Sequence, residues 1–241
     1  MTLEKELPSG WEKVKLDEIS SVVKGVSFDK KLSSDLPFEN SMPILRAGNI
    51  SSRLEINNDL IWVDKNSVSD QQYLQRNDIV ICMSSGSKNL VGKSATNTNE
   101  NWLGSIGAFC CIVRPNQKIY KNFLSFWFKS ENFKSWIART NYGTNIRNLK
   151  LGELRKINLE LPPLDVQQRI VEILDKAERL KELREETIKK SEELVKSIFH
   201  RLQILLQLYL QAILTHGMIL LMRPWIFLFL LHMHMPALGE S

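Results

Sequence analysis

The chain has 241 residues, with 32 Lys and Arg against 27 Asp and Glu, 43% hydrophobic residues and three cysteines. These totals describe an ordinary globular protein with one core and room for a second element, and they exclude a collagen-like, disulfide-stapled or wholly disordered chain. The net charge of +5 is uneven, because residues 80–156 alone carry 12 basic and 3 acidic groups. Such a block suits a polyanionic partner, and the alternative is a solvated basic face without a partner.

The N-terminal residues 1–6 lack a basic region followed by an apolar run, so we expect no export signal. From Leu7 to about Leu161, short apolar runs rich in β-branched residues predict strands, and polar or glycine-containing loops separate them. The predicted strands are 11–16, 43–45, 60–63, 79–83, 109–113 and 157–161. The predicted loops include 24–27, 47–49, 84–89 and 141–145.

Residues 122–138 predict one helix whose aromatic side chains share a face, which favours a place in the core over a base-stacking platform. The cysteines Cys82, Cys110 and Cys111 stand in apolar runs. They are expected to be small core residues of a cytoplasmic protein rather than catalytic or metal-binding groups. About 150 residues of mixed elements predict an α+β fold with a mixed-sheet domain.

Pro162 and Pro163 end the last predicted strand, and Asp165 is a plausible N-cap for a single amphipathic helix over residues 166–202. So long a helix cannot cover its own apolar stripe, so it needs a second helix from another chain or from a part of this one that is missing. The stripe slips phase near Arg184 and Thr187, which predicts an irregular, antiparallel pairing. The stripe residues proposed for this pairing are Ile170, Ile173, Leu174, Ala177, Leu180, Leu183, Ile188, Leu194, Val195 and Ile198.

The last forty residues differ in composition from the rest. All four histidines lie at or after position 200, and 22 of the 30 residues from Ile204 to Met233 are hydrophobic. The uncharged run 204–222 meets a length rule for a membrane helix, but its Gln, Thr, His and Gly residues argue against that reading. We favour a shifted reading frame or a truncation. A membrane or partner-binding tail and a native continuation of the amphipathic helix stay as alternatives.

Groups typical of catalysis are missing from most of the chain. No nucleotide-phosphate loop occurs, and residues 1–199 contain no histidine, which removes Ser-His-Asp and Cys-His catalysis and the usual metal sites. The acids Asp59, Asp64, Asp70 and Asp78 form no nuclease pattern with a neighbouring lysine. Residues 161–164 lack the Asn and the aromatic residue of a methyltransferase target-base loop. The sequence therefore favours a binding module, with no catalytic residue, metal or cofactor of its own.

Polar loops in and near the basic block are the candidate DNA-reading surface. Arg, Lys and Asn match the hydrogen-bonding pattern of the major groove, and Ser and Thr usually contact phosphate, although each loop alone is more often an ordinary turn. The candidates are Arg46, Asn49, Ser84, Ser85, Ser87, Lys88, Asn89, Lys93, Arg139, Tyr142, Thr144, Asn145 and Arg147.

Several segments together resemble one family. Residues 7–19, which read LPSGWEKVKLDEI, are similar to the opening of a target-recognition domain in specificity subunits of type I restriction-modification systems. Residues 43–50, 77–84, 143–144 and 154–157 are similar to later parts of that domain. The segment 161–171, LPPLDVQQRIV, resembles the start of the family's conserved helix, and the resemblance covers residues 7 to about 200.

The resemblance implies a non-catalytic, DNA-binding subunit. Such subunits usually carry two recognition domains, each reading half of a bipartite DNA site, separated by antiparallel conserved helices. They dock modification subunits that use S-adenosylmethionine and a restriction subunit that uses ATP and Mg. Here the expected parts are a recognition domain at 1–163, a helix for dimerisation and spacing at 164–203 and an atypical tail at 204–241.

With one recognition domain and one helix, the chain resembles a half-length or truncated subunit, and a second copy or a partner half-subunit could cover the stripe. The alternative is a truncated or silent-cassette subunit that binds modification subunits without productive DNA recognition. An independent enzyme is disfavoured by the missing catalytic groups. The coding DNA across codons 195–215 would show whether another frame continues into a second domain.

Overall fold

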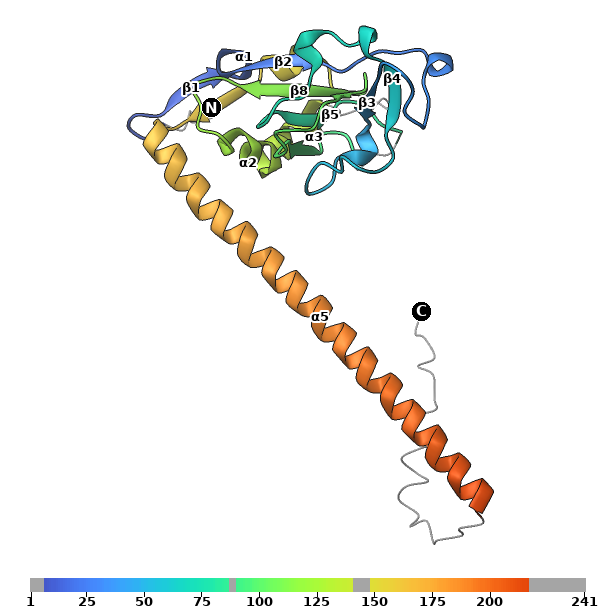
Figure 1. Ribbon diagram of the computed structural model, residues 1–241. Coiled ribbons are helices and arrows are strands. Elements are labelled where there is room, and N and C mark those ends of the chain that lie inside the picture. Colours follow the sequence, from blue (N-terminus) through green and yellow to red (C-terminus); the bar gives the residue numbers. More distant parts are fainter. Residues whose placement is uncertain (1–6, 87–89, 141–147, 217–241) are drawn as a thin grey trace. The chain divides into compact units, whose positions relative to one another are not determined.

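The computed structural model describes residues 7–86, 90–140 and 148–216 (Figure 1). The chain divides into two compact units after Ala177. The first unit holds the strands and short helices together with the first turns of a long helix, and the second unit holds the rest of that helix. The α+β fold class expected from the sequence is confirmed.

Three small sheets build the first unit. The largest is antiparallel, with the order β2 (Ser20–Lys24), β8 (Cys110–Pro115), β5 (Ile79–Cys82) and β6 (Ser94–Thr96). The second has the order β4 (Ile61–Asp64), β3 (Ser41–Leu45) and β7 (Ser105–Ile106), where β3 is antiparallel to β4 and parallel to β7. The third pairs β1 (Glu12–Lys15) with β9 (Asn158–Leu161). All six predicted strands are present, and β2, β6 and β7 are additional.

The central strands β5 and β8 are buried on both faces, which explains why they read as continuous apolar runs rather than as alternating patterns. Successive side chains point to opposite faces of a sheet. On one face, Ile81 and Cys111 pack in a cluster with aromatic residues of the neighbouring helices. On the other face, Val80 and Ile112 pack in a cluster with Leu45 of β3. The same two strands therefore serve two cores.

The short helices are α1 (Leu16–Ile19), α2 (Phe123–Lys129), α3 (Glu131–Thr140) and α4 (Leu151–Arg155). The prediction of one helix over 122–138 is wrong, because Ser130 is extended and separates α2 from α3. The Ser130 hydroxyl donates to the Trp127 carbonyl at 2.7 Å, and the Ser130 carbonyl accepts from the Lys134 amide at 3.2 Å. The aromatic cluster belongs to the core as expected, since Phe133 is fully buried.

The long helix α5 (Leu164–His216) has 53 residues, which corresponds to about 80 Å at 1.5 Å per residue. It is longer than the expected 166–202. Because it begins at Leu164, Asp165 is a residue of the first turn and not the predicted N-cap, although its charge still complements the helix dipole. Across the segments that the structure describes, no helix is long and apolar enough to cross a membrane.

The first turns of α5 are packed into the rest of the first unit through Gln167 and Val171, which are 1% and 2% exposed. The Gln167 side chain accepts a hydrogen bond from the Tyr120 amide at 2.8 Å and donates one to the Pro162 carbonyl at 2.7 Å. The Gln-Gln pair of the sequence motif thus contributes one buried connector, Gln167, and one exposed residue, Gln168.

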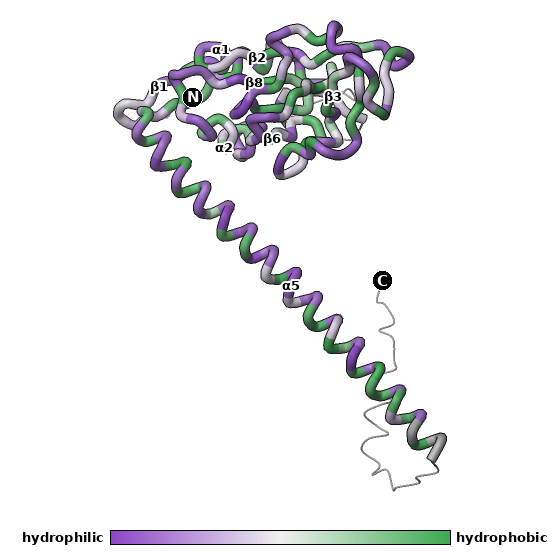
Figure 2. The backbone as a smooth tube through the Cα atoms, in the orientation of Figure 1, coloured by the Kyte–Doolittle hydropathy of each residue, from purple (hydrophilic) through white to green (hydrophobic). Residues whose placement is uncertain are grey.

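Beyond these turns the helix is amphipathic, as expected, and hydrophobic residues become dominant toward its end (Figure 2). The predicted stripe lies on the surface. Its large side chains with substantial exposure are Ile173, Leu174, Leu180, Leu183, Ile188, Leu194, Val195 and Ile198.

Candidate nucleic-acid interface

A groove of about 720 Å³ lies beside the ends of several strands of the first unit. It is bounded by the segment after β2, the turn after β3 and the loops that follow β5 and precede β8. The side chains in its lining that carry chemistry are Ser27, Phe28, Lys30, Arg46, Asp59, Ser84, Ser85 and Phe109.

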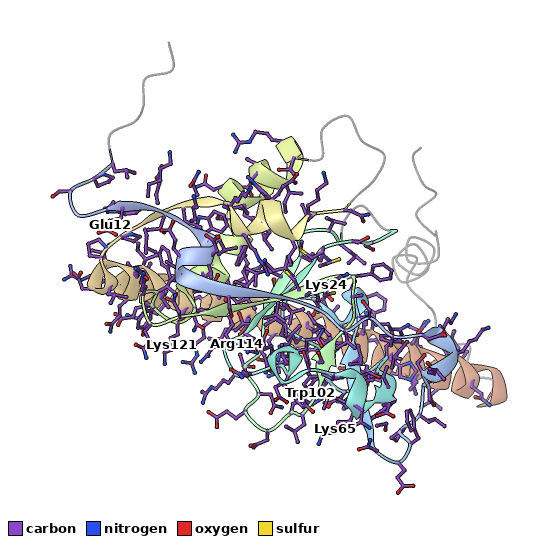
Figure 3. All side chains as sticks on the ribbon, turned by 90° about the horizontal axis from the view of Figure 1, so that it is seen from above. Glu12, Lys24, Lys65, Trp102, Arg114 and Lys121 are labelled. Carbon is purple, nitrogen blue, oxygen red and sulfur yellow. The ribbon has the colours of Figure 1, made fainter. Side chains whose placement is uncertain are left out.

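Gly25 and Gly107 let two of these segments approach closely. A Cβ atom at Gly25 would stand 2.1 Å from the Gly107 carbonyl oxygen, so no larger residue fits without a backbone shift. The Gly25 amide donates to the Cys110 carbonyl at 3.0 Å, and the Val26 amide donates to the Ile106 carbonyl at 2.7 Å. Lys24, labelled in Figure 3, is the last residue of β2 before this approach. The close contact fixes one wall of the groove.

Arg46 is the best positioned cation of the groove. Its guanidinium forms an ion pair with the Asp59 carboxylate, and 42% of its side chain stays exposed. The turn that carries it is held by Asn49, whose side-chain oxygen accepts from the Arg46 amide at 2.7 Å. The Asn49 side-chain nitrogen donates to the carbonyls of Glu55 and Asn58. The arginine is therefore oriented before any ligand arrives.

Ser84, Ser85 and Phe109 form the opposite side. The Ser84 amide donates to the Phe109 carbonyl at 3.1 Å, which holds the loop after β5 against the start of β8. Phe109 is 68% exposed, an unusual position for a phenylalanine next to two buried cysteines. An exposed aromatic ring beside hydroxyl groups and an arginine offers apolar and polar contacts on one surface.

The structure brings together only some of the candidates from the sequence. Arg46, Ser84 and Ser85 line the groove. Asn49 is 2% exposed and its amide is used by the backbone, so in this structure it braces the turn and cannot reach a base edge. Lys93 is exposed but does not line the groove, and Arg139 lines a different groove. Seven candidates lie outside the described residues: Ser87, Lys88, Asn89, Tyr142, Thr144, Asn145 and Arg147.

Sequence reasoning missed Phe28, Lys30, Asp59 and Phe109 as groove residues. The sequence predicts a strand over 109–113 that includes Phe109, whereas the strand begins one residue later at Cys110. For Phe28 and Lys30, the only sequence signal of a position near a functional surface is the predicted loop 24–27, which they follow.

Some cations of the basic block, residues 80–156, stabilise the fold through internal hydrogen bonds and ion pairs. Arg114, labelled in Figure 3, pairs with the buried Asp78 at 2.7 Å and also donates to the Tyr73 carbonyl. Arg155 donates to the Val22 carbonyl at 2.7 Å. These cations tie β8 and α4 to neighbouring segments, so they are not free to neutralise phosphate.

The three cysteines are buried thiols, as expected. Cys82 and Cys110 are cross-strand partners. A hydrogen bond with the Cys82 thiol and burial raise the pKa of Cys110, while the same contact lowers the pKa of Cys82. Burial raises the pKa of Cys111. Within the ranges that the structure covers, no group of three or more His, Cys, Asp or Glu residues is placed to hold a metal ion.

Comparison with known proteins gives consistent results. Residues 8–193 match the family described as the type I restriction modification DNA specificity domain. Two curated relatives are the specificity subunits of the type I restriction enzymes EcoKI of Escherichia coli (strain K12) and StySPI of Salmonella potsdam. Each is 36% identical over 170 residues, which is 70% of this chain and 36% of the relative.

Solved structures show the same fold. The HsdS subunit from Thermoanaerobacter tengcongensis aligns with a TM-score of 0.53 and 20% identity, over 74% of this chain and 40% of that one. A chain from a study of complex assembly and conformational transition of the type I R-M system aligns with a TM-score of 0.56 and 19% identity, over 75% and 41%. The chain thus spans little more than a third of the length of the curated relatives that it matches.

Proposed function

This chain belongs to the family of type I restriction-modification DNA specificity domains, and from that premise we propose that it reads one half of a bipartite DNA target. The groove that joins Arg46, Ser84, Ser85 and the exposed Phe109 is the observation that supports this proposal most directly. It offers the groups that DNA recognition needs on one surface.

Each groove residue has a role that its chemistry favours. Arginine can donate two hydrogen bonds to guanine O6 and N7 in the major groove, and the ion pair with Asp59 limits the orientations that Arg46 can adopt. Ser84 and Ser85 suit contacts to phosphate, and Phe109 suits apolar contact with a thymine methyl group. Lys30 adds a second cation at the groove. Ser87, Lys88 and Asn89 lie outside the described residues and stay sequence-based candidates for DNA contact.

The proposal includes partners. We expect modification subunits that supply S-adenosylmethionine chemistry, a restriction subunit that uses ATP and Mg, and a second copy of this chain or a partner half-subunit along the exposed stripe of α5. The cytoplasmic location expected from the cysteines also stays a prediction. In this assignment the chain contributes recognition, and the partner subunits carry the catalysis.

DNA binding can be tested directly with the full chain and fluorescein-labelled duplexes of mixed sequence. Because each neutralised phosphate releases counterions, the observed binding constant should fall steeply between 50 and 200 mM salt. Arg46→Ala should weaken binding with little change in the salt slope, because the slope reports contacts to phosphate, whereas Arg53→Ala, at an exposed arginine that does not line the groove, should not weaken binding. Phe109→Ala should weaken binding more than Phe38→Ala, which truncates an exposed phenylalanine elsewhere.

Recognition of a specific DNA sequence needs a second measurement. The chain is expressed in cells that contain only modification subunits of a related system, and methylated bases are mapped across the genome. The proposal predicts a new methylated motif whose sequence preference relaxes at one position in Arg46→Ala and is unchanged in Arg53→Ala. Capture of modification subunits without any new motif would instead support the non-productive alternative, and salt-insensitive binding would contradict the proposal.

A further inference from the structure

A second groove, of about 910 Å³, lies where α5 begins, and all of its lining belongs to the first unit. Half-buried aromatic rings form much of its apolar surface: Trp11, which precedes β1, and Trp127 and Trp136 of the α2–α3 region. Ile170 and Leu174 of α5 complete this surface. The same two residues are also the first members of the stripe, so the groove borders the place where the stripe begins.

Toward its described end, α5 is apolar over most of its circumference, with Gln203, Gln207 and Gln211 along the remaining face. Ile204, Leu205, Leu206 and Leu208 are between 42% and 62% exposed, and no Lys, Arg, Asp or Glu occurs from 202 to 216. Pairing with one other helix covers a single stripe, whereas an apolar arc this wide needs cover on more than one side. This end of α5 therefore requires a second surface in addition to a helical partner.

Building on the pairing of two copies through α5, and on the alternative that residues after 203 are a native continuation of this helix, which the structure extends to His216, we propose that the aromatic groove of each copy receives the apolar end of α5, residues 204–213, from the other copy. The two helices run antiparallel, so that the end of one reaches the beginning of the other. The occupant is a second copy of this chain, and the contact is made twice in the symmetric pair.

The sequence of the stripe selects the register. In a heptad alignment, antiparallel pairing places Ile170 opposite Leu208 of the other copy and Ile173 opposite Leu205, while Thr187 and Ser191 meet at the centre. A shift of one heptad in one direction brings Arg184 against Arg201 of the other copy. A shift in the opposite direction carries Leu208 beyond the start of α5. Only the first register pairs the apolar ends without a clash of like charges.

The flanks of the helix agree with this arrangement. Successive residues of a helix are about 100° apart, and Ile170 is taken as the reference direction. On this scale Leu174 lies at about 40°, Gln167 at about 60° and Val171 at about 100°, on the flank that packs against the rest of the first unit. A twofold axis between antiparallel helices keeps equivalent flanks on the same side of the pair.

At the other end, counting from Leu205, the residues Tyr209, Ile213 and Leu206 lie about 40°, 80° and 100° around the helix on the equivalent flank. These side chains consequently face the groove of the other copy. Ile204 lies about 100° from Leu205 in the opposite direction, so its side chain faces away from the groove of the other copy.

The rim charges fit an occupant without lysine. Lys13, Arg139 and Lys156 line the groove, against the single acid Glu160. The segment 204–213 carries no charge, so its insertion brings no cation to this rim. A lysine introduced on the inserted flank would meet like charges at once.

Disulfide mapping in the full chain tests the direction and register. Ile173→Cys and Leu205→Cys are made singly and together, and the native cysteines are all buried. Under oxidised glutathione, antiparallel pairing predicts covalent dimers in the double variant and none in either single variant. Parallel pairing would link each single variant, and that result would overturn the proposal.

A matched pair of variants tests the groove. Leu206 and Ile204 are 42% and 43% exposed and lie on opposite flanks of Leu205. Groove occupancy predicts that Leu206→Lys raises the dimer dissociation constant at least tenfold above that of Ile204→Lys in sedimentation equilibrium, because it loses a buried leucine and adds a repelled cation. Trp11→Ala, which removes one ring of the groove, should also raise the dimer dissociation constant.

The possible outcomes distinguish a failure of the groove contact between two copies from a failure of the proposed DNA recognition. Equal dissociation constants for the two lysine variants would overturn the groove contact. So would a Leu206→Lys variant that pairs normally but loses capture of modification subunits, since the groove would then belong to that partner. A chain that is monomeric yet keeps Arg46-dependent DNA binding would refute only the groove contact. Dimers with the predicted crosslinks that bind no DNA would refute only the proposed function.

Discussion

Replacing Gln167 by methionine should destabilise the first unit, because the buried Gln167 side chain makes two hydrogen bonds there that methionine cannot make. Gln167 is 1% exposed and connects the Tyr120 amide with the Pro162 carbonyl. Methionine has a similar volume, so packing changes little, but a buried amide and a buried carbonyl lose their partners. Each unsatisfied group costs about 1–3 kcal/mol, and we expect a total loss of about 2–4 kcal/mol.

Gln168 provides the control, because its exposed side chain bonds only to Glu172. Gln168→Met should stay within about 0.5 kcal/mol of the parent protein. Urea unfolding followed by tryptophan fluorescence is a suitable assay, since five of the six tryptophans lie between residues 11 and 136. With a slope of about 2 kcal/mol per molar urea, the midpoint for Gln167→Met should fall by about 1–2 M. Equal midpoints for the two variants would refute the assignment of Gln167 as the connector.

Three further predictions concern the same unit. Gly25→Ala should lower the thermal midpoint by several degrees and weaken DNA binding, because its Cβ would collide with the Gly107 carbonyl; a midpoint equal to that of the parent would contradict the close approach. Arg114→Met should cost about 3–5 kcal/mol in urea unfolding, since it leaves the buried Asp78 carboxylate without its partner. The Cys111 thiol should resist a thiol reagent until the protein unfolds. Because burial raises its pKa above the ordinary value of 9.0, only the unfolded thiol ionises as the pH rises through about 9, so stability should fall there.

The sequence predicts a strand correctly where its hydrophobic pattern matches the burial of the strand in the folded chain. The runs at β5 and β8 are apolar on both faces because they lie between two cores, and such runs are visible in sequence. In contrast, β7 has only two residues and exists because β3 and the segment after β2 approach it. The break at Ser130 was hidden for a similar reason, since hydroxyl and backbone bonds interrupt an otherwise continuous helical pattern.

The functional surfaces were harder to predict than the fold. Arg46 and the serines after β5 were identified because polar residues after apolar strands are a local signal. Asn49 carries the same signal, but its amide is consumed by three backbone groups that only the folded turn brings near it. The predicted strand 109–113 includes Phe109, because the sequence cannot show that β8 begins at the next residue. A displacement of one residue decides whether that ring is buried or faces the groove.

Folding also redistributes the charge that first indicated a polyanionic partner. The two cations that line the first groove, Lys30 and Arg46, come from residues 1–79, where acids outnumber bases. From the basic block itself, Arg114 bonds internally, whereas Arg139 and Lys156 line the second groove. A net charge summed along the sequence therefore locates neither surface. If the first groove reads DNA, Lys30→Ala should reduce the salt slope by about one unit, as expected for a cation beside phosphate, whereas Lys156→Ala should leave the slope unchanged.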